Sequence, residues 1–333
     1  MSYQLSLLDK SPIAKGETAF DALKRTLSLA QAAERLGFHR FWVAEHHDTA
    51  DLASSAPELV ISWLLAGTKR IRVGSGGVML QHYSPYKVAE NFNTLSALGG
   101  GRVDLGIGKA PGGLPFSTRA LQSEREAGRR LDFEYLLSDL TTFLDGTQGN
   151  DRAKATPVPV SGPERFLLGA SVDSAELAAG KDWGFVFARH LNGDEALLAA
   201  SVERYRQLTG NAPVVAVSAI LARDGRVATE QAEKFRPLKL HVPGRQSVTV
   251  GSEEQAKEFA RQAGVTEYRT EPAVPSLIAG APRDLLKELN RLNAQLGITE
   301  FIVDLFNQGD SRLEAVELLG AAHAETDRAA IPA

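Results

Sequence analysis

Short apolar runs alternate with longer segments of helical period along most of the chain. Each run is rich in Val, Ile, Leu or Phe, and the segment behind it repeats apolar residues every three or four positions. This alternation is typical of a parallel sheet, because each helix carries the chain back to the edge where the next strand starts. The eight runs are residues 4–8, 41–44, 71–80, 103–107, 166–170, 185–188, 214–221 and 301–305.

Residues typical of helix ends lie between the predicted strand runs. Residues 21–36 carry apolar residues at helical spacing and stop at Gly37, a common C-terminal signal. The next helix is expected to take Ser54 or Ser55 as its N-cap and to place Pro57 in its first turn. The helices therefore have defined ends between the strand runs.

Eight strand–helix units predict an α/β fold, the (β/α)8 or TIM barrel, as a single domain over residues 1–333. Residues 236–282 do not fit the repeat and hold two similar pieces, each an apolar run, a glycine and a helix. We interpret this region as an insertion after strand 7, because it has too few apolar residues for a separate domain. A doubly wound two-domain fold is the alternative, although no change in composition marks a boundary.

Composition narrows the classes of function. The 333 residues include no cysteine, which excludes thiolate catalysis, iron–sulfur clusters and cysteine-ligated zinc. Lys and Arg number 37 against 41 Asp and Glu, with no basic block, so nucleic acid is not an expected partner. The chain also has no apolar stretch of the ~20 residues that span a membrane, and we expect a soluble, cytosolic protein with no membrane partner.

Polar and small residues directly after the strand runs are the candidates for chemistry, because barrel active sites lie where the strands end. These residues are Asp9, Glu45, His46, His47, Gly76, Gly77, Lys109, Ser171, Ser174, Arg189 and His190.

Two adjacent histidines follow the second run. His46 and His47 point to opposite faces of an extended backbone, so one is expected at the barrel mouth and the other in a structural role. Zinc ligation with His82 or His190 is one interpretation, although no zinc-binding spacing is present. A histidine held by a neighbouring carboxylate is another. We favour an acid, base or hydrogen-bond donor beside a bound cofactor.

Glycines inside the third run weaken a strand. Gly76 and Gly77 therefore indicate either a bulge where a ligand lies against the backbone or close packing at a barrel corner. The later sequence LGIGKAPGG lacks the spacing of a dinucleotide fingerprint, and Pro111 interrupts it, so we expect no direct use of NADH.

A phosphate site is possible after the fifth run. Ser171 is a natural N-cap with Ser174 three residues on, and free N–H groups at a helix start bind phosphate. Plain capping explains the same residues equally well. Lys109 and Arg119, in a glycine-containing loop, would supply positive charge, or would simply be solvated.

Three segments together resemble one family. RFWVAEHHD, then IRVGSGGVMLQHYSPYKVAENFNTLSALGGGRVDLGIGKAPGG, then LLGASVDSAELAA are similar to successive motifs of the bacterial luciferase-like, flavin-dependent monooxygenases. The resemblance is dense from about residue 1 to 190 and loose beyond it. As an ordered set the motifs are specific.

The resemblance implies a (β/α)8 barrel enzyme that binds reduced FMN, supplied by a separate NAD(P)H:flavin reductase. It implies activation of O2 as a flavin C4a-peroxide and oxygenation of a small organic substrate. His46 matches the active-site histidine beside the isoalloxazine, and Glu45 matches its acidic neighbour. Gly76 and Gly77 match the small pair, often joined by a cis peptide, that lies against the flavin ring.

The same resemblance assigns the FMN phosphate to the helix start at Ser171, Val172 and Ser174, with Lys109 and Arg119 as basic contacts. Lys109 stands where the family usually has arginine, so the charge is kept without the bidentate fork. Gly108 stands where luciferases carry a reactive cysteine, which argues against light emission and a long-chain aldehyde substrate. The alternatives are F420-dependent hydride transfer in the same barrel family and a flavin-binding protein without turnover.

Three further expectations concern the surroundings of the site. The loop after the fourth run and the insertion are candidate lids that exclude water. The aromatic residues Tyr83, Tyr86 and Phe116 are candidates for the substrate pocket or for packing. Residues 55–67 are apolar nearly all round, which predicts a homodimer through this helix, or its burial under the insertion.

Overall fold

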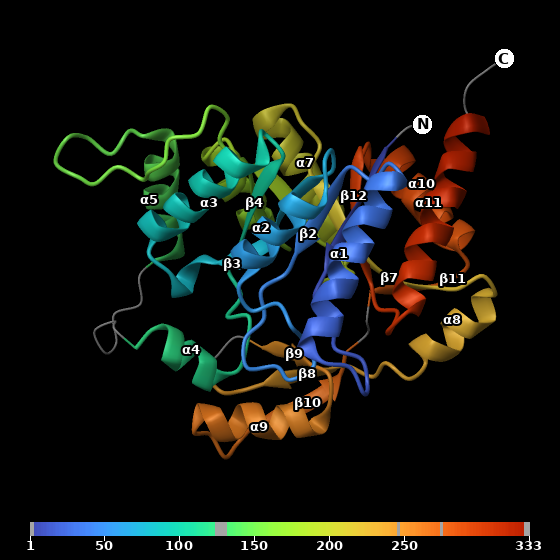
Figure 1. Ribbon diagram of the computed structural model, residues 1–333. Coiled ribbons are helices and arrows are strands. Elements are labelled where there is room, and N and C mark those ends of the chain that lie inside the picture. Colours follow the sequence, from blue (N-terminus) through green and yellow to red (C-terminus); the bar gives the residue numbers. More distant parts are fainter. Residues whose placement is uncertain (1–2, 124–131, 245–246, 274–275, 330–333) are drawn as a thin grey trace.

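The computed structural model describes residues 3–123, 132–244, 247–273 and 276–329 (Figure 1). Eight parallel strands pair in the order β7–β12–β1–β2–β3–β4–β5–β6, and pairing of β6 with β7 closes the barrel. All eight predicted strands are confirmed, and closure excludes the doubly wound alternative. The strands are β1 Gln4–Asp9, β2 Arg40–Val43, β3 Arg72–Met79, β4 Val103–Gly108, β5 Glu164–Gly169, β6 Gly184–Ala188, β7 Val214–Leu221 and β12 Glu300–Leu305.

Helices surround the barrel and run back toward the amino ends of the strands (Figure 1). Helix α1 ends just before Gly37, as predicted, but it begins two residues before the predicted start, behind a capping box of Thr18 and Asp21. In the part of the chain that the structure describes, no helix is long and apolar enough to cross a membrane. The helices are α1 Ala19–Arg35, α2 Pro57–Gly67, α3 Pro85–Gly99, α5 Phe133–Asp145, α6 Val172–Gly180, α7 Glu195–Thr209, α8 Gly225–Ala232, α10 Pro282–Leu296 and α11 Ser311–Ala329.

The predicted cap of α2 is wrong. Ala56 occupies the N-cap position and makes no side-chain cap, although Pro57 does begin the helix. The buried Ser54 instead donates its hydroxyl to the carbonyl of Ala44 at 2.7 Å. The serine therefore stabilises the loop after β2 instead of capping α2. Helix-end patterns in the sequence do not predict this role.

The insertion forms a small antiparallel sheet at the carboxyl end of the barrel, seen at the bottom of Figure 1. It contains β8 Leu238–His241, β9 Val248–Val250, α9 Glu253–Ala263 and β10 Arg269–Pro272. The predicted boundary at residue 282 needs a correction, because β11 Leu277–Gly280 pairs in parallel with the end of β7. Strand β7 extends beyond its pairing with β6, and β11 takes up the exposed edge.

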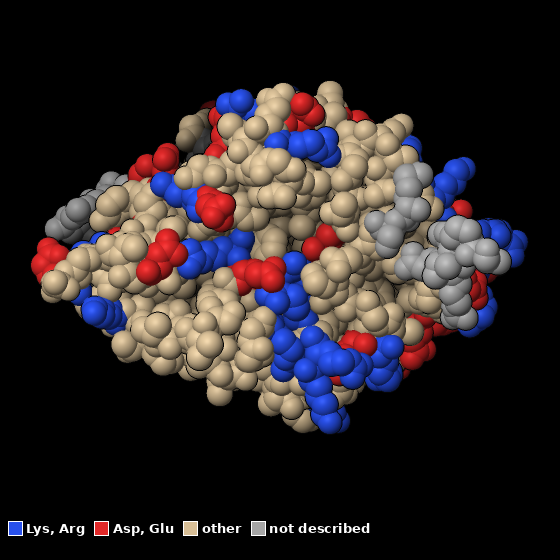
Figure 2. All heavy atoms as spheres, turned by 90° about the horizontal axis from the view of Figure 1, so that it is seen from above, with Lys and Arg blue, Asp and Glu red and all other residues tan. Residues whose placement is uncertain are grey.

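The barrel interior has a charged layer at the amino ends of the strands. Arg40 contacts Asp104 at 3.0 Å and Glu300 at 2.9 Å, while Arg72 contacts Asp104 at 2.6 Å. Trp42 Nε1 also donates to Asp104. Figure 2 views this end from outside, where acidic and basic side chains lie side by side near the centre of the face.

An apolar layer lies next along the barrel. Residues two apart on a strand face the same side, so β2 turns Arg40 and then Trp42 inward, and β12 turns Glu300 and then Ile302 inward. Trp42 packs edge-to-face on Phe166. The other buried members of this cluster are Leu8, Ala44, Val186, Val214 and Ala216. With the amino end closed by these two layers, the carboxyl end is the open mouth.

We predict that Asp104→Asn lowers the free energy of unfolding by about 3 kcal/mol, because it removes one charge from a buried ionic network and leaves two arginines short of a partner. The matched control is Asp145→Asn, which breaks the more exposed pair with Arg165 and is expected to cost less than about 1 kcal/mol. Urea unfolding of both variants checks this. Equal losses would contradict a special role for the charged layer.

Candidate active site at the barrel mouth

The carboxyl end of the barrel carries an arc of polar residues from five neighbouring strands. His190 follows β6, Ser218 lies in β7, Asp304 in β12, Lys10 follows β1 and His46 follows β2. Because these strands are adjacent in the order β6–β7–β12–β1–β2, the residues lie side by side one layer beyond the apolar core. We refer to these five residues as the polar arc.

An ion pair forms the centre of the polar arc. Lys10 Nζ lies 2.6 Å from Asp304 Oδ2, and the side chain of Asp304 is only 2% exposed. The ammonium group of Lys10 also lies 4.4 Å from the ring centroid of Phe306. Sequence reasoning missed both members of this pair, although an aspartate inside the apolar run FIVDLF was a signal of an inward-facing polar position.

His46 belongs to the polar arc and has an unusual environment. Its Nδ1 is buried and has no hydrogen-bond partner among the described residues. Burial, with a smaller contribution from Lys10, lowers the pKa of His46 to about 4, while Asp304 acts in the opposite direction. The imidazole is therefore neutral at pH 7, with one nitrogen able to accept a proton.

His190, at the other end of the polar arc, has an environment similar to that of His46. Its Nδ1 is also buried without a partner in the described part of the chain. Burial lowers the pKa of His190 to about 4, against the opposing effects of Asp304 and a hydrogen bond to the Ala216 backbone. Two neutral imidazoles thus flank one ion pair.

Glu45 and His47 lie away from the polar arc. Glu45 Oε1 accepts hydrogen bonds from His47 Nε2 at 2.7 Å and Tyr83 Oη at 2.8 Å, and Oε2 accepts from Met79 N at 3.1 Å. Burial and Glu45 raise the pKa of Tyr83. The expectation that one of the two adjacent histidines is structural is met by His47, and Glu45 acts as the hub that ties the end of β2 to the end of β3.

The two glycines of β3 form a bulge against β4. The Gly76–Gly77 peptide is cis, and the register with β4 shifts between Ser75 and Val78. A Cβ on Gly76 would lie 2.7 Å from Leu8 Cδ1, and one on Gly77 would lie 2.8 Å from the carbonyl oxygen of Gly106. Packing of the barrel on itself therefore requires glycine here.

The start of α6 is capped by its own serine. Ser171 Oγ accepts from Ser174 N at 3.2 Å and lies 3.0 Å from Ser174 Oγ. Val172 begins the helix, so two hydroxyls and the first N–H groups of α6 meet at one point. Lys109 and Arg119 make no ion pair or hydrogen bond with these serines within the described residues.

The two candidate lids contact each other. Helix α4 Pro115–Leu121, from the loop after β4, packs against α9 of the insertion (Figure 1). Phe116 N donates to Gln262 Oε1 at 2.8 Å, and Arg119 donates to the Gln262 carbonyl. Arg119 and Arg261 also lie 4.5 and 5.0 Å from the Phe116 ring. Both lids lie at the carboxyl end, and Arg119 belongs to the contact between them.

Three other candidate residues pack elsewhere. Asp9 accepts from Arg312 and Thr26, which ties β1 to the outer helices. Arg189 pairs with Glu195 and Glu288 of the outer helices. Tyr86 packs edge-to-face on a phenylalanine of α5.

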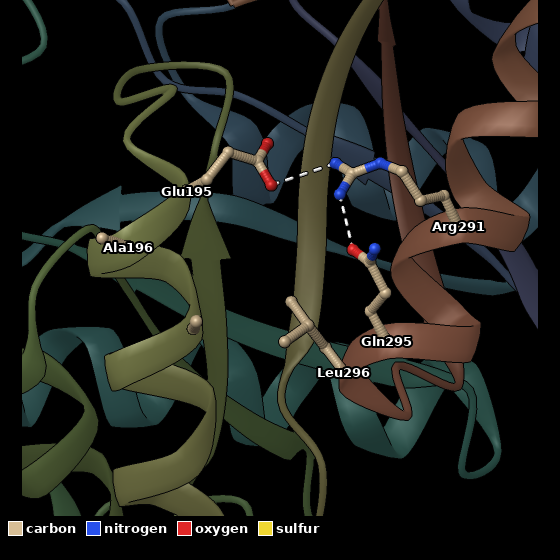
Figure 3. Close-up of a pocket in the computed structure, with 6 residues that line it drawn as sticks. Glu195, Ala196, Arg291, Gln295 and Leu296 are labelled. Atoms are coloured by element: carbon tan, nitrogen blue, oxygen red, sulfur yellow. Dashed lines mark hydrogen bonds and ion pairs between the residues drawn. The ribbon is translucent and has the colours of Figure 1, made fainter.

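A cavity of about 600 Å³ lies on the outside of the barrel, between α7 and α10 (Figure 3). Arg291 there contacts Glu195 at 3.0 Å and Gln295 at 2.6 Å. The cavity contains no strand-end residue and its charges pair with one another, so it is not the candidate active site. Across the described ranges, no group of three or more His, Asp or Glu side chains is arranged to hold a metal ion.

Comparison with known proteins agrees with this architecture. A family model described as luciferase-like monooxygenase matches residues 1–307. The chain is 42% identical over 312 residues to the N-acetyl-S-alkylcysteine monooxygenase of Bacillus subtilis (strain 168), covering 90% of this chain and 92% of that protein.

Solved structures share the barrel over nearly the full length. The structure of apo-MsnO8 has a TM-score of 0.78 and 28% identity, covering 97% of this chain and 98% of that one. The oxygenating constituent of 3,6-diketocamphane monooxygenase from Pseudomonas putida, in complex with FMN, has a TM-score of 0.67, 17% identity and coverage of 98% and 99%. An F420-dependent secondary alcohol dehydrogenase has a TM-score of 0.67, 16% identity and coverage of 96% and 98%. The last two likenesses concern the fold alone.

We predict that the neutral imidazoles make stability depend on pH. Because the pKa of His190 is about 4 in the folded protein and about 6.5 in an unfolded chain, the unfolded state binds more protons between these values. The free energy of unfolding should therefore fall as pH drops from about 6.5 to 4, and less steeply in His190→Gln. Urea unfolding across this range measures both slopes, with pH 7.5–8, where the curves should run parallel, as the control. Parallel curves down to pH 4 would contradict the prediction.

Proposed function

The chain belongs to the luciferase-like monooxygenase family, and we propose that it is an FMN-dependent monooxygenase that takes reduced flavin from a separate reductase. The observation that carries the proposal is the position of His46, a neutral histidine with a buried, unpartnered nitrogen at the mouth of the barrel. Family membership alone leaves FMN and F420 open, because both cofactors occur in enzymes of this fold.

The residues at the mouth suit a flavin. The unpartnered nitrogens of His46 and His190 supply buried polar atoms that a heterocyclic ring would satisfy. The hydroxyls of Ser171 and Ser174 and the N–H groups at the start of α6 would hold a phosphate. FMN carries such a phosphate on its ribityl chain, and reduced FMN supplies the two electrons that activate O2.

Each residue then has a defined task. His46 accepts or holds a proton at one ring nitrogen next to the reacting groups. Glu45 holds the loop after β2, through His47 and Tyr83, and so positions the backbone that carries His46. The contact between α4 and α9 would limit the entry of water to the barrel mouth and so protect the reacting groups from side reactions.

One relative supports a proposal for the substrate class. We propose an N-acetylated S-alkylcysteine, because the relative named for that substrate is similar over 90% of this chain. One oxygen atom of O2 would enter the substrate and the other would leave as water, with both electrons coming from reduced flavin.

A homodimer through α2 is a further part of the proposal. Leu59 is 71% exposed and Trp63 is 38% exposed, although Val60 and Leu64 on the same helix are buried. Helix α2 packs against α1 and α3, while the insertion lies at the carboxyl end of the barrel (Figure 1). The alternative of burial under the insertion therefore loses its support.

We predict that His46→Ala reduces substrate oxidation by about 10²- to 10⁴-fold, because it removes the proton-handling group at the reacting centre. Anaerobic titration with reduced FMN, followed by mixing with O2 and an N-acetyl-S-alkylcysteine, measures binding and turnover separately. The variant should still bind reduced FMN and unfold at nearly the wild-type temperature. Full activity of His46→Ala would remove His46 from the mechanism. Binding of FMN without turnover by the wild type would favour a flavin-binding protein, and binding of F420 alone would favour hydride transfer.

We also predict that the double variant Leu59→Glu/Trp63→Glu is monomeric, because two carboxylates would have to be buried unpaired in an α2 interface. Light scattering during gel filtration gives the molar mass of each protein. Val160→Glu is the control, since Val160 is fully exposed and lies in the long loop before β5. A wild-type monomer would overturn the dimer.

A further inference from the structure

The buried carboxylate of Asp304 needs a positive partner. The apolar layer of Leu8, Ile302 and Ala216 lies directly beneath it, and its side chain is only 2% exposed. Among the described residues, the only hydrogen bond that it accepts comes from Lys10 Nζ at 2.6 Å. A carboxylate removed from water in this way is stable only with a counter-charge or with a proton of its own.

Lys10 is held in place on its other side as well. Its ammonium group lies 4.4 Å from the Phe306 ring centroid, and Phe306 packs edge-to-face on Phe235 with centroids 5.2 Å apart. The lysine side chain is 24% exposed, so it is neither fully buried nor free to extend into solvent. The aromatic contact keeps the charge beside Asp304.

Two other groups of the polar arc are able to provide the same counter-charge. The carboxylate of Asp304 favours protonation of both His46 and His190, and the ammonium group of Lys10 opposes it. His47 is the remaining charged or titratable neighbour of His46, and the Ala216 backbone is the hydrogen-bond partner of His190. One carboxylate thus has three candidate cations, and only one is needed.

We propose that Lys10 is a positioning residue, which occupies Asp304 and so adds to burial in keeping the imidazoles of His46 and His190 unprotonated. Each ring then retains a nitrogen lone pair for a molecule in the barrel mouth. Without Lys10, the buried charge of Asp304 would favour a proton on one of the rings, and that ring would change from an acceptor into a pure donor at a higher pH than in the wild type. The functional consequence rests on the proposed role of His46 in catalysis, but the charge state itself does not.

The test measures the charge state without flavin or substrate. Histidine titration is followed by NMR on the full chain labelled at histidine Cε1, with His46→Gln and His190→Gln used to assign the signals. In the wild type, both rings should remain neutral down to the lowest pH at which the fold persists. In Lys10→Met, the titration midpoint of at least one ring should rise by about one to two pH units.

Four further variants distinguish the role of the ion pair from the separate roles of Lys10 and Asp304. Asp304→Asn should not raise either midpoint, and Lys10→Met/Asp304→Asn should return both rings to wild-type behaviour, because no unpaired carboxylate remains. Lys10→Arg keeps the charge and should leave both rings neutral. Lys10→Gln is the second neutral substitution if Lys10→Met does not fold. The signal of His241, on the insertion sheet, reports any general effect of a substitution on the protein.

Unchanged titration of both rings in Lys10→Met and Lys10→Gln would overturn the proposal. So would a raised midpoint that persists in the double variant, because Lys10 would then act without Asp304. Neither result depends on flavin binding or on turnover, so failure of this inference is distinguishable from failure of the proposed monooxygenase function.

Discussion

Closure of the eight-stranded barrel is the constraint on which the rest of the structure depends. Once β6 pairs with β7, every inward-facing side chain shares a narrow interior with those of seven other strands. Charged groups are tolerated there only in neutralising sets, as in the layer around Arg40 and Asp104. Apolar groups fill the next layer, and the third layer faces the open mouth, where Lys10, Asp304 and the two histidines lie.

The same closure explains why the mouth suits proton chemistry. The layer beneath it is apolar, and burial keeps His46 and His190 neutral far below their ordinary pKa. A neutral imidazole both donates and accepts, whereas an imidazolium only donates. Lys10 and Asp304 neutralise each other's charge within this layer. The contact between α4 and α9 lies at the same end of the barrel.

Local patterns predicted the elements well and their long-range partners poorly. The strand runs and the end of α1 follow from apolar spacing and from the glycine signal at Gly37, which act within a few residues. Ser54 looked like a helix cap but binds the carbonyl of Ala44, and residues 277–280 looked like part of the insertion but extend the barrel sheet. In both cases a partner distant from the local pattern decided the outcome.

The sequence by itself determined the order of strands and helices, the family, and the histidine and serine motifs at the strand ends. Tertiary structure decided which of those residues share a space. His46 and His47 are neighbours in the chain, yet only His46 belongs to the polar arc, because successive residues of an extended backbone face opposite sides. Lys10 and Asp304 lie 294 positions apart and meet because β1 and β12 are adjacent in the closed barrel. Spacing along the chain does not predict such a contact, because barrel closure depends on all eight strands together.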